Sequence, residues 1–217
     1  MRFKEVIKTL VQCDFDGTIT EEDIGLMLLD TFADGDWRQM FREYHEGKIS
    51  VGRFNTDAFA MVKADRENLL KVARSKVKIR PGFHELVACC RRKGFRLVIV
   101  SNGLDFYIDE IFKDMGISDI EVHAAETRFH TEGLRVQYIG PDGSHLDKDV
   151  KGAYVNSFLR EGYRLIYVGD GISDISPARR CHHIFATGDL PAHCKQTNLG
   201  CIPFTEFNEV ARVLELW

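Results

Sequence analysis

The sequence of 217 residues lacks several features that would place it in common classes of protein. No apolar run approaches the roughly 18 residues that a membrane-spanning helix requires. The formal net charge is −4 and the pI is about 6.1, so no positive excess favours nucleic acid or an anionic membrane as partner. The N-terminal stretch MRFKEVIKTLVQCDFD has neither the apolar segment nor the cleavage site of a secretory signal. We therefore expect a cytoplasmic protein with no membrane and no nucleic-acid partner.

The cysteines also exclude two kinds of site. No CxxC pair and no spacing typical of a zinc site is found among Cys13, Cys89, Cys90, Cys181, Cys194 and Cys201. We expect reduced thiols that mostly lie in the core. The hydrophobic fraction of 44% and the charged fraction of 29% are ordinary for a globular chain. The length suits one large domain, or a core domain with a smaller second unit.

Short apolar runs rich in β-branched residues indicate buried strands of a parallel sheet. These runs are 9–13, 96–100, 165–168 and 184–186. Segments with the apolar spacing of helices lie between them, at 81–94, 105–116 and 151–161, with Asp105 as the expected N-cap of the second. The alternation predicts a doubly wound, Rossmann-like α/β domain.

Two stretches depart from this alternation. Residues 20–78 look helical throughout, and 120–147 have the pattern of short strands with turns near 132–133 and 141–143. We predict an α/β core formed by 1–19 and 79–217, and a helical cap formed by 20–78 that is inserted after the first strand. The Phe and Met residues of this insert leave two interpretations open, a packed core or the interface of a homo-oligomer.

Polar residues follow the predicted strands at the edge of the sheet where ligands of open parallel sheets bind. They are Asp14 and Asp16, Ser101 and Asn102, and Asp170 and Asp174. Alternate residues of an extended segment face the same side, so both aspartates of the first pair are expected to point into one cavity. Converging carboxylates would repel each other unless a hard cation joined them, and Mg²⁺ prefers such oxygen ligands. The sequence therefore predicts a magnesium site.

Each of these residues also has a simpler interpretation. A single aspartate at a strand end is usually a turn former or a helix N-cap. Ser-Asn-Gly and Gly-Asp-Gly are common turns, and Lys151 near a helix start is most often solvated. The functional hypothesis depends on all of them following strands of one predicted sheet, in order.

Four motifs of the chain resemble those of a known family. The stretch DFDGTIT at 14–20 resembles the first motif of the haloacid dehalogenase superfamily of phosphatases. Ser101 resembles the second motif, Lys151 the third, and GDGISD at 169–174 the fourth. The inserted helices are similar to the cap of the phosphoserine phosphatase-like branch. Within that branch, CKQTNLGCIPFTEFNEV and DFDGTITEEDI are most similar to the 2-hydroxy-3-keto-5-methylthiopentenyl-1-phosphate phosphatases of methionine salvage.

This resemblance implies a magnesium-dependent phosphatase that acts on a small phosphorylated metabolite. Asp14 would be the nucleophile that forms an aspartyl-phosphate. Asp16 would protonate the leaving oxygen and then take a proton from the attacking water. Lys151 would balance the charge of the nucleophile and the phosphate.

The resemblance also assigns metal and substrate contacts. The metal would be held by Asp14, the backbone carbonyl of Asp16, Asp170 and Asp174. The Ser101 hydroxyl and the Asn102 backbone N–H would bind phosphoryl oxygens, and Thr18 would hydrogen-bond the nucleophile's loop next to the substrate.

The predicted cap offers fewer signals. Glu21, with the two acidic residues after it, either meets a polar group of the substrate or enriches the first turn of a helix in acid. Arg42 and Arg53 are candidates for binding a substrate carboxylate, although arginines at such positions more often lie on solvated helix faces.

Several other functions stay open at this point. Phosphoserine or another small phosphomonoester is an alternative substrate, and a phosphotransferase would use the same intermediate with an acceptor alcohol. A binding module without chemistry would have no need to keep several like charges in one cavity. Carbon–halogen hydrolysis would not need the acid at Asp16.

Overall fold

A mostly parallel, eight-stranded sheet organises residues 7–217, which are the residues that the computed structural model describes. The strand order is β5-β4-β3-β2-β1-β6-β7-β8. The strands are β1 Thr9–Cys13, β2 Arg96–Leu104, β3 Glu121–His130, β4 Gly133–Ile139, β5 His145–Leu146, β6 Arg164–Gly169, β7 His183–Ala186 and β8 Ile202–Pro203. Residues 1–6, the start of the predicted core segment 1–19, lie outside the described part.

Strand β1 lies in the middle of the sheet. It pairs in parallel with β2 on one side and with β6 on the other, and all of its residues are buried. A strand covered on both faces needs a continuous apolar run, which explains the composition TLVQC apart from Gln12. The carboxyl ends of these three strands therefore open at the same edge of the sheet.

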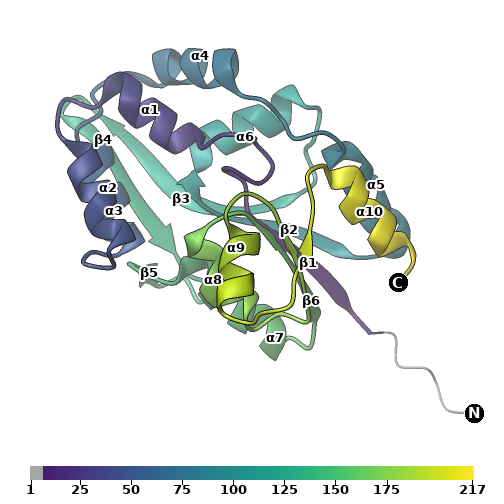
Figure 1. The fold of residues 1–217 in the computed structure, drawn as a ribbon. Helices are drawn as coiled ribbons and strands as arrows, with labels where there is room; N and C mark the ends of the chain where they lie inside the picture. The colour runs from purple at the N-terminus through teal and green to yellow at the C-terminus, as the bar shows by residue number, and fades with distance from the viewer. Residues whose placement is uncertain (1–6) are drawn as a thin grey trace, which may run out of the picture.

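Helices cover both faces of this sheet (Figure 1). Helices α5, α6 and α10 lie on one face, and α7, α8 and α9 lie on the other. The core helices are α5 Phe83–Lys93, α6 Asp105–Asp114, α7 Val150–Arg160, α8 Ile172–Ala178, α9 Leu190–Gln196 and α10 Phe207–Glu215. This is the doubly wound α/β arrangement that the alternation of strands and helices predicts, and the fold class is confirmed.

The segment between β1 and α5 is helical. Its helices are α1 Ile24–Phe32, α2 Trp37–His45, α3 Val51–Phe59 and α4 Arg66–Lys76. The two ends of the segment lie side by side, because Thr20 and Ile79 form an antiparallel bridge and Arg80 N–H donates to the Ile19 carbonyl at 2.8 Å. The helical insertion after the first strand is confirmed, whereas its limits as a unit, 20–78, stay a prediction.

The hairpin of β3 and β4 continues the sheet beneath this helical segment. Strand β3 is parallel to β2 at its start and antiparallel to β4 at its end. Helix α3 packs across β4, where the Thr56 hydroxyl donates to the Val136 carbonyl at 3.3 Å. The start of α3 is fixed by Asp147, whose carbonyl accepts the Gly52 N–H at 2.9 Å. The hairpin therefore links the core sheet to the inserted helices.

Some local expectations need correction. The N-cap of α6 is Leu104, and Asp105 is the first helical residue. Its carboxylate instead accepts the N–H groups of Phe106 at 2.7 Å and Thr127 at 3.1 Å, which joins α6 to β3. The expected short strands in 120–147 include the long strand β3, because its two halves pair with different neighbours.

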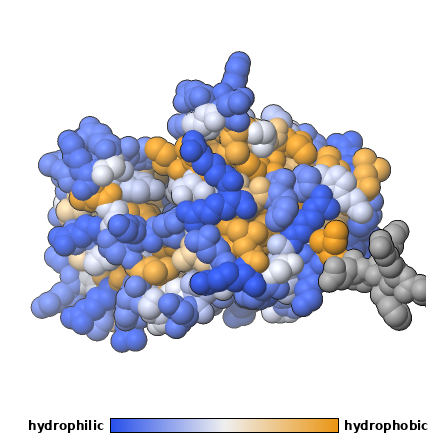
Figure 2. Space-filling view, turned by 90° about the horizontal axis from the view of Figure 1, so that it is seen from below, coloured by the Kyte–Doolittle hydropathy of each residue, from blue (hydrophilic) through white to orange (hydrophobic). Residues whose placement is uncertain are grey.

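Viewed from the side of α7, α8 and α9, hydrophilic residues interrupt the apolar ones over much of the surface (Figure 2). Large apolar side chains that stay exposed within residues 7–217 are Ile7, Ile172, Ile202, Leu216 and Trp217. None of the helices in this part of the chain has the length and apolarity of a membrane span. A homo-oligomer stays a prediction.

A test of the fold concerns Gly82, which precedes α5. Its φ is +86°, and a Cβ at this position would clash with the backbone of Asn208 at the start of α10. We predict that Gly82→Ala lowers the free energy of unfolding by more than about 2 kcal/mol, measured by urea denaturation. Gly94→Ala is the control, since Gly94 also has a positive φ but faces open space. Equal losses in both variants would contradict the packing of α5 on α10.

Candidate active site

The cavity lies where the carboxyl ends of β1, β2 and β6 meet the inserted helices. Its volume is about 460 Å³. Asp14 follows β1, Ser101 lies near the end of β2, and Asp170 follows β6, and all three line the cavity. The topology therefore brings together side chains that are far apart in the sequence. Asp14 and Asp170, for example, are separated by more than 150 positions.

The carboxylate of Asp14 is buried and held on both oxygens. Its Oδ1 accepts the N–H of Phe15 at 2.7 Å, and its Oδ2 accepts from Lys151 Nζ at 2.6 Å. Burial raises the pKa of Asp14 to about 6, even though the ammonium group of Lys151 opposes the shift. The side chain is thus oriented by two fixed donors at the floor of the cavity.

Lys151 joins two of the carboxylates. Its Nζ donates to Asp14 and to Asp174 at 2.6 Å each, and to the Ser173 hydroxyl at 3.0 Å. Burial alone would lower the pKa of Lys151, but the two carboxylates more than offset it and raise the pKa above its usual range. Lys151 is therefore a permanently charged bridge and not the solvated side chain of the simpler interpretation.

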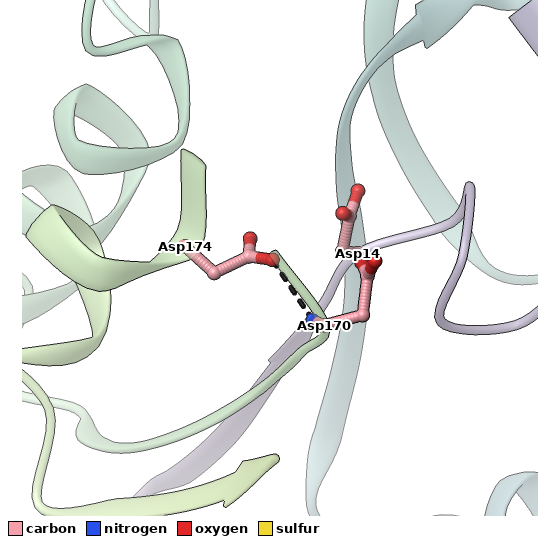
Figure 3. A group of neighbouring side chains, drawn as sticks. All are labelled: Asp14, Asp170 and Asp174. Atoms are coloured by element: carbon pink, nitrogen blue, oxygen red, sulfur yellow. Dashed lines mark hydrogen bonds between the residues drawn. The ribbon is translucent and has the colours of Figure 1, made fainter. Parts of the chain in front are cut away.

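Asp174 is fully occupied by protein donors. Its Oδ1 accepts from Lys151 and from the Tyr167 hydroxyl, at 2.6 and 2.7 Å. Its Oδ2 accepts the N–H groups of Asp170 and Gly171, at 2.9 and 3.0 Å. A carboxylate offers about four lone-pair positions, so this one shapes the loop after β6 (Figure 3).

Asp170 has fewer partners and faces Asp14 (Figure 3). Burial and the repulsion of Asp174 and Asp14 raise the pKa of Asp170 to about 8. The Thr18 hydroxyl donates to its Oδ1 at 2.9 Å, and Thr18 is completely buried. Its hydroxyl thus orients Asp170, and Thr18 is not among the residues that line the cavity, so its expected place next to the substrate stays a prediction. Gly17 leaves room for the same carboxylate, since a Cβ there would clash with it.

Asp16 points away from this group. Its Oδ1 accepts the N–H of Ile24 at 2.9 Å, and its Oδ2 accepts from the Tyr107 hydroxyl at 2.6 Å. Burial and the nearby Asp23 raise the pKa of Asp16 well above its ordinary value. A carboxyl that tends to hold a proton at the cavity wall is suited to acid–base chemistry. The metal contact expected from its backbone carbonyl stays a prediction.

Ser101 and Asn102 lie in an irregular part of β2. The pairing with β3 shifts between Val100 and Leu104, and the Ser101 hydroxyl accepts the N–H of Gly103 at 2.9 Å. Both residues line the cavity beside Asp14. The expected pair of phosphate-binding residues is thus close to the expected nucleophile.

The wall opposite the carboxylates comes from the inserted helices and is largely apolar. It includes Leu26, Leu29, Phe41, Tyr44, Val51, Phe54 and Phe59. The ring of Tyr44 stacks on that of Phe54, with centroids 5.7 Å apart and an interplanar angle of 9°. For the phenylalanines of the insert, the sequence left two interpretations, a packed core or an oligomer interface. Some of them instead face the cavity.

The polar cap residue at the cavity is Asp23 and not Glu21. Asp23 caps α1, its Oδ1 accepts the N–H of Leu26 at 2.7 Å, and it lines the cavity. Glu21 is exposed, and its backbone pairs with Lys78. Glu21 is not among the residues that line this cavity, and its expected substrate contact stays a prediction. The sequence signal for Asp23 was its place directly before an apolar helical pattern, which is typical of a helix N-cap residue. Because this helix follows the first strand, its N-terminus is expected at the ligand-binding edge of the sheet.

Sequence reasoning missed Tyr107 and Asn55. Tyr107 belongs to the apolar face of α6 and is completely buried, and Asn55 lies on α3 with 6% of its surface exposed. Their periodicity indicates only helix packing. The available signal was the polar atom that each side chain carries within an apolar helix face. For Tyr107, a second signal was its place just after the carboxyl end of β2.

The site has the chemistry of a hard-cation site. One oxygen from each of Asp14, Asp170 and Asp174 lies within 4.8 Å of the others. A single ammonium group cannot neutralise all of them, and the pKa values of Asp14 and Asp170 are raised first by burial and then by the repulsion between the carboxylates. Oxygen donors of this kind fit Mg²⁺, so the residues present suit the ion that the sequence predicts.

A parallel sheet with an acidic site at its carboxyl edge and a helical insertion after the first strand is typical of a capped hydrolase with a Rossmann-like core. The chain belongs to the haloacid dehalogenase-like hydrolase family, whose model matches residues 11–179. It is a phosphatase of that family, a hydrolase of phosphoric monoesters.

Individual relatives agree with this placement. The chain is 26% identical over 212 residues to a 2-hydroxy-3-keto-5-methylthiopentenyl-1-phosphate phosphatase of Brevibacillus brevis, covering 96% of each protein. It is 29% identical over 210 residues to the protein of that name from Geobacillus thermodenitrificans, covering 94% of each. A phospho-aspartyl intermediate analogue of phosphoserine phosphatase has a similar fold, with a TM-score of 0.71 at 19% identity over 96% of this chain and 99% of that one.

The excess of carboxylates predicts a pH-dependent effect of metal. A carboxyl whose pKa is raised in the folded state is more stable protonated, so the metal-free fold loses stability as the pH rises from about 4 towards about 8. We expect Mg²⁺ to raise the melting temperature more at about pH 8 than at about pH 5, relative to EDTA. The measurement is thermal unfolding followed by circular dichroism.

Asp170→Asn serves as the control for this effect. It removes one repelling charge, so it should stabilise the metal-free protein at about pH 8 and lose most of the gain from Mg²⁺. A gain in the wild type that is equal at both pH values would count against a cation at these carboxylates.

Proposed function

We propose that this phosphatase hydrolyses a small phosphorylated metabolite through a phosphorylated Asp14, with Mg²⁺ as cofactor. The observation that supports this most directly is the geometry of Asp14. Its carboxylate lies at the cavity floor, is held by Phe15 N–H and Lys151 Nζ, and faces Asp170. A nucleophile fixed by two donors loses little freedom when it attacks in line.

In the first step, an oxygen of Asp14 forms a bond to phosphorus while the bond to the leaving alkoxide oxygen breaks. Asp16 donates its proton to that oxygen, so the alcohol leaves neutral. Asp16, now a carboxylate, then takes a proton from the water that attacks the phosphorus of the intermediate. The bond between phosphorus and Asp14 breaks and inorganic phosphate is released. The hydrogen bond from Tyr107 keeps Asp16 in one orientation throughout.

The remaining residues manage charge. Ser101 and the backbone N–H of Asn102 would donate to phosphoryl oxygens, and Lys151 would stay paired with Asp14 and Asp174. Mg²⁺ would be held by Asp14, Asp170 and the Asp16 carbonyl, with Asp174 supporting it through the loop after β6. The ion supplies neutralisation of the charge that gathers on the transferring phosphoryl group.

The cavity favours a substrate whose organic part is uncharged. Among its described lining residues there is no arginine, and the one lysine is already paired with two carboxylates; the other groups that can carry positive charge are His45 and His193, which do so only when protonated. Arg42 does not line the cavity, and Arg53 pairs with Asp57 on the surface of α3. A buried substrate carboxylate without a cationic partner is costly. This disfavours phosphoserine, whose phosphatases share the fold.

The aromatic wall suits a neutral, apolar tail. The relatives are named for 2-hydroxy-3-keto-5-methylthiopentenyl-1-phosphate, which carries hydroxyl, keto and methylthio groups and no charge beyond its phosphate. Sulfur contacts with aromatic rings are favourable, and Phe41, Tyr44 and Phe54 supply them. Asp23 would accept a hydrogen bond from a substrate hydroxyl. We therefore propose this enol-phosphate, or a close neutral analogue, as the substrate, and a cytoplasmic location follows as an expectation.

The role of Asp14 is tested by Asp14→Asn, which keeps the shape of the side chain and removes the nucleophile. We expect kcat to fall by at least about a thousandfold while the circular dichroism spectrum is unchanged. Asp36→Asn is the matched control, because Asp36 caps α2 outside the cavity and asparagine caps as well. Substantial turnover by Asp14→Asn would rule out covalent catalysis by this residue.

The substrate is tested by phosphate release from a panel that contains the methylthiopentenyl enol-phosphate, phosphoserine and phosphocholine. We expect kcat/KM for the enol-phosphate to exceed that for phosphoserine by at least about a hundredfold. Leu26→Arg places a cation in the apolar wall of the cavity. This variant should have a higher kcat/KM for phosphoserine, so the ratio of the two kcat/KM values should decrease.

Other outcomes of the panel identify the alternatives. A preference for phosphocholine would assign the aromatic wall and Asp23 to a cationic tail. Alcohol release that exceeds phosphate release when an acceptor alcohol is added would indicate a phosphotransferase.

A further inference from the structure

The backbone carbonyl of Asn102 is bound by side chains and not by the backbone of a neighbouring strand. Between Val100 and Leu104, β2 has more residues than its partner β3 has between His123 and Ala125, so the backbone of Ser101–Gly103 bulges out of the ladder. Backbone groups in such a bulge lose their strand partners and need others. The side chain of Asn102 does not fix the bulge, because its Oδ1 has no hydrogen-bond partner within residues 7–217.

Two side chains from different elements satisfy this carbonyl. Asn55 Nδ2 donates to it at 2.9 Å from helix α3, and the Tyr138 hydroxyl donates at 2.6 Å from strand β4. The two donors also contact each other. Both residues are buried, with exposed fractions of 6% and 2%. Burial makes such a contact persistent, because no water replaces a lost donor.

The orientation of this carbonyl sets the direction of the next N–H. In a trans peptide the carbonyl of Asn102 and the N–H of Gly103 point in opposite directions. While the carbonyl faces Asn55 and Tyr138, the N–H of Gly103 faces the Ser101 hydroxyl, to which it donates at 2.9 Å. The two side-chain contacts to the Asn102 carbonyl therefore fix the loop that faces the nucleophile.

The opposite side of the loop is also closely packed, at Gly103. A Cβ at Gly103 would clash with both Asp16 Oδ2 and the Tyr107 hydroxyl, which are hydrogen-bonded to each other. The loop is thus confined between the Asp16–Tyr107 pair and the Asn55–Tyr138 pair.

We propose that Asn55 and Tyr138 are positioning residues: by holding the Asn102–Gly103 peptide, they keep the Ser101 hydroxyl and the Asn102 N–H in the orientation that binds the phosphoryl group. The inference rests on the proposed function of Ser101 and Asn102 as the phosphate contacts. It makes an inserted helix part of the phosphate site, through the hydrogen bond from Asn55 to the Asn102 carbonyl.

The test uses Tyr138→Phe and Asn55→Leu, alone and combined. Tyr138→Phe removes only the hydroxyl, and Asn55→Leu removes the donor without adding negative charge to the cavity that Asn55 lines. Two matched controls remove a hydroxyl that donates to a backbone carbonyl elsewhere. Tyr154→Phe acts on the Ile139 carbonyl, and Thr56→Val acts on the Val136 carbonyl beside Asn55.

Binding of orthovanadate in the presence of Mg²⁺, measured by calorimetry, reports on the phosphoryl site without turnover. We expect vanadate to bind about tenfold more weakly to each single variant. The loss of affinity in the double variant should be smaller than the product of the two single losses, because both donors serve one acceptor. The controls should bind within about twofold of the wild type. The value of kcat/KM for 4-nitrophenyl phosphate should fall in parallel, and urea denaturation monitors stability.

Two results separate this inference from the proposed function. Variants that lose stability yet bind vanadate like the controls would overturn the positioning role and leave the phosphatase mechanism intact. A wild type that binds vanadate but hydrolyses no compound of the panel would contradict the proposed substrate, while the variant series would still decide the role of Asn55 and Tyr138.

Discussion

The ammonium group of Lys151 lies between two buried carboxylates that would otherwise repel each other across the floor of the cavity. It reaches Asp14 and Asp174 at 2.6 Å each, and 3% of its surface is exposed. Its backbone is held as well, because Gln12 in the middle of β1 donates from Nε2 to the Lys151 carbonyl at 3.1 Å. Removing one partner of such a buried set typically costs about 3–5 kcal/mol. The polar residue within the apolar run of β1 is thus explained by the lysine it fixes.

The same network divides the carboxylates by role. Asp174 accepts hydrogen bonds from Lys151, Tyr167 and the loop after β6, so its role is to hold the structure of the site. Asp14 and Asp170 keep capacity towards the cavity and have raised pKa values because burial leaves their charge in excess. Asp16 is separated from them by its bonds to Ile24 N–H and Tyr107, which suits a proton carrier better than a metal ligand.

Much of the core could be predicted because local pattern and topology agree there. The run 9–13 coincides with β1, and the polar residues at the strand ends converge because parallel strands open at one edge. Asn55 of the inserted helices and Tyr107 of the core could not be predicted in the same way, since both belong to helix faces whose neighbours are set by tertiary packing. Thr18 shows the same limit, because its partner Asp170 is distant in sequence.

The bridge between Thr20 and Ile79 brings the helical insert back to the core at the point where it left. A segment joined at one such point can be exchanged for another with little disturbance of the sheet, which offers a route by which one catalytic floor acquires different substrate ranges. The hydrogen bond from Asn55 to Asn102 limits that freedom. A transplanted cap would need a donor at the same place on its own helix, or the acquired specificity would come with a slower enzyme.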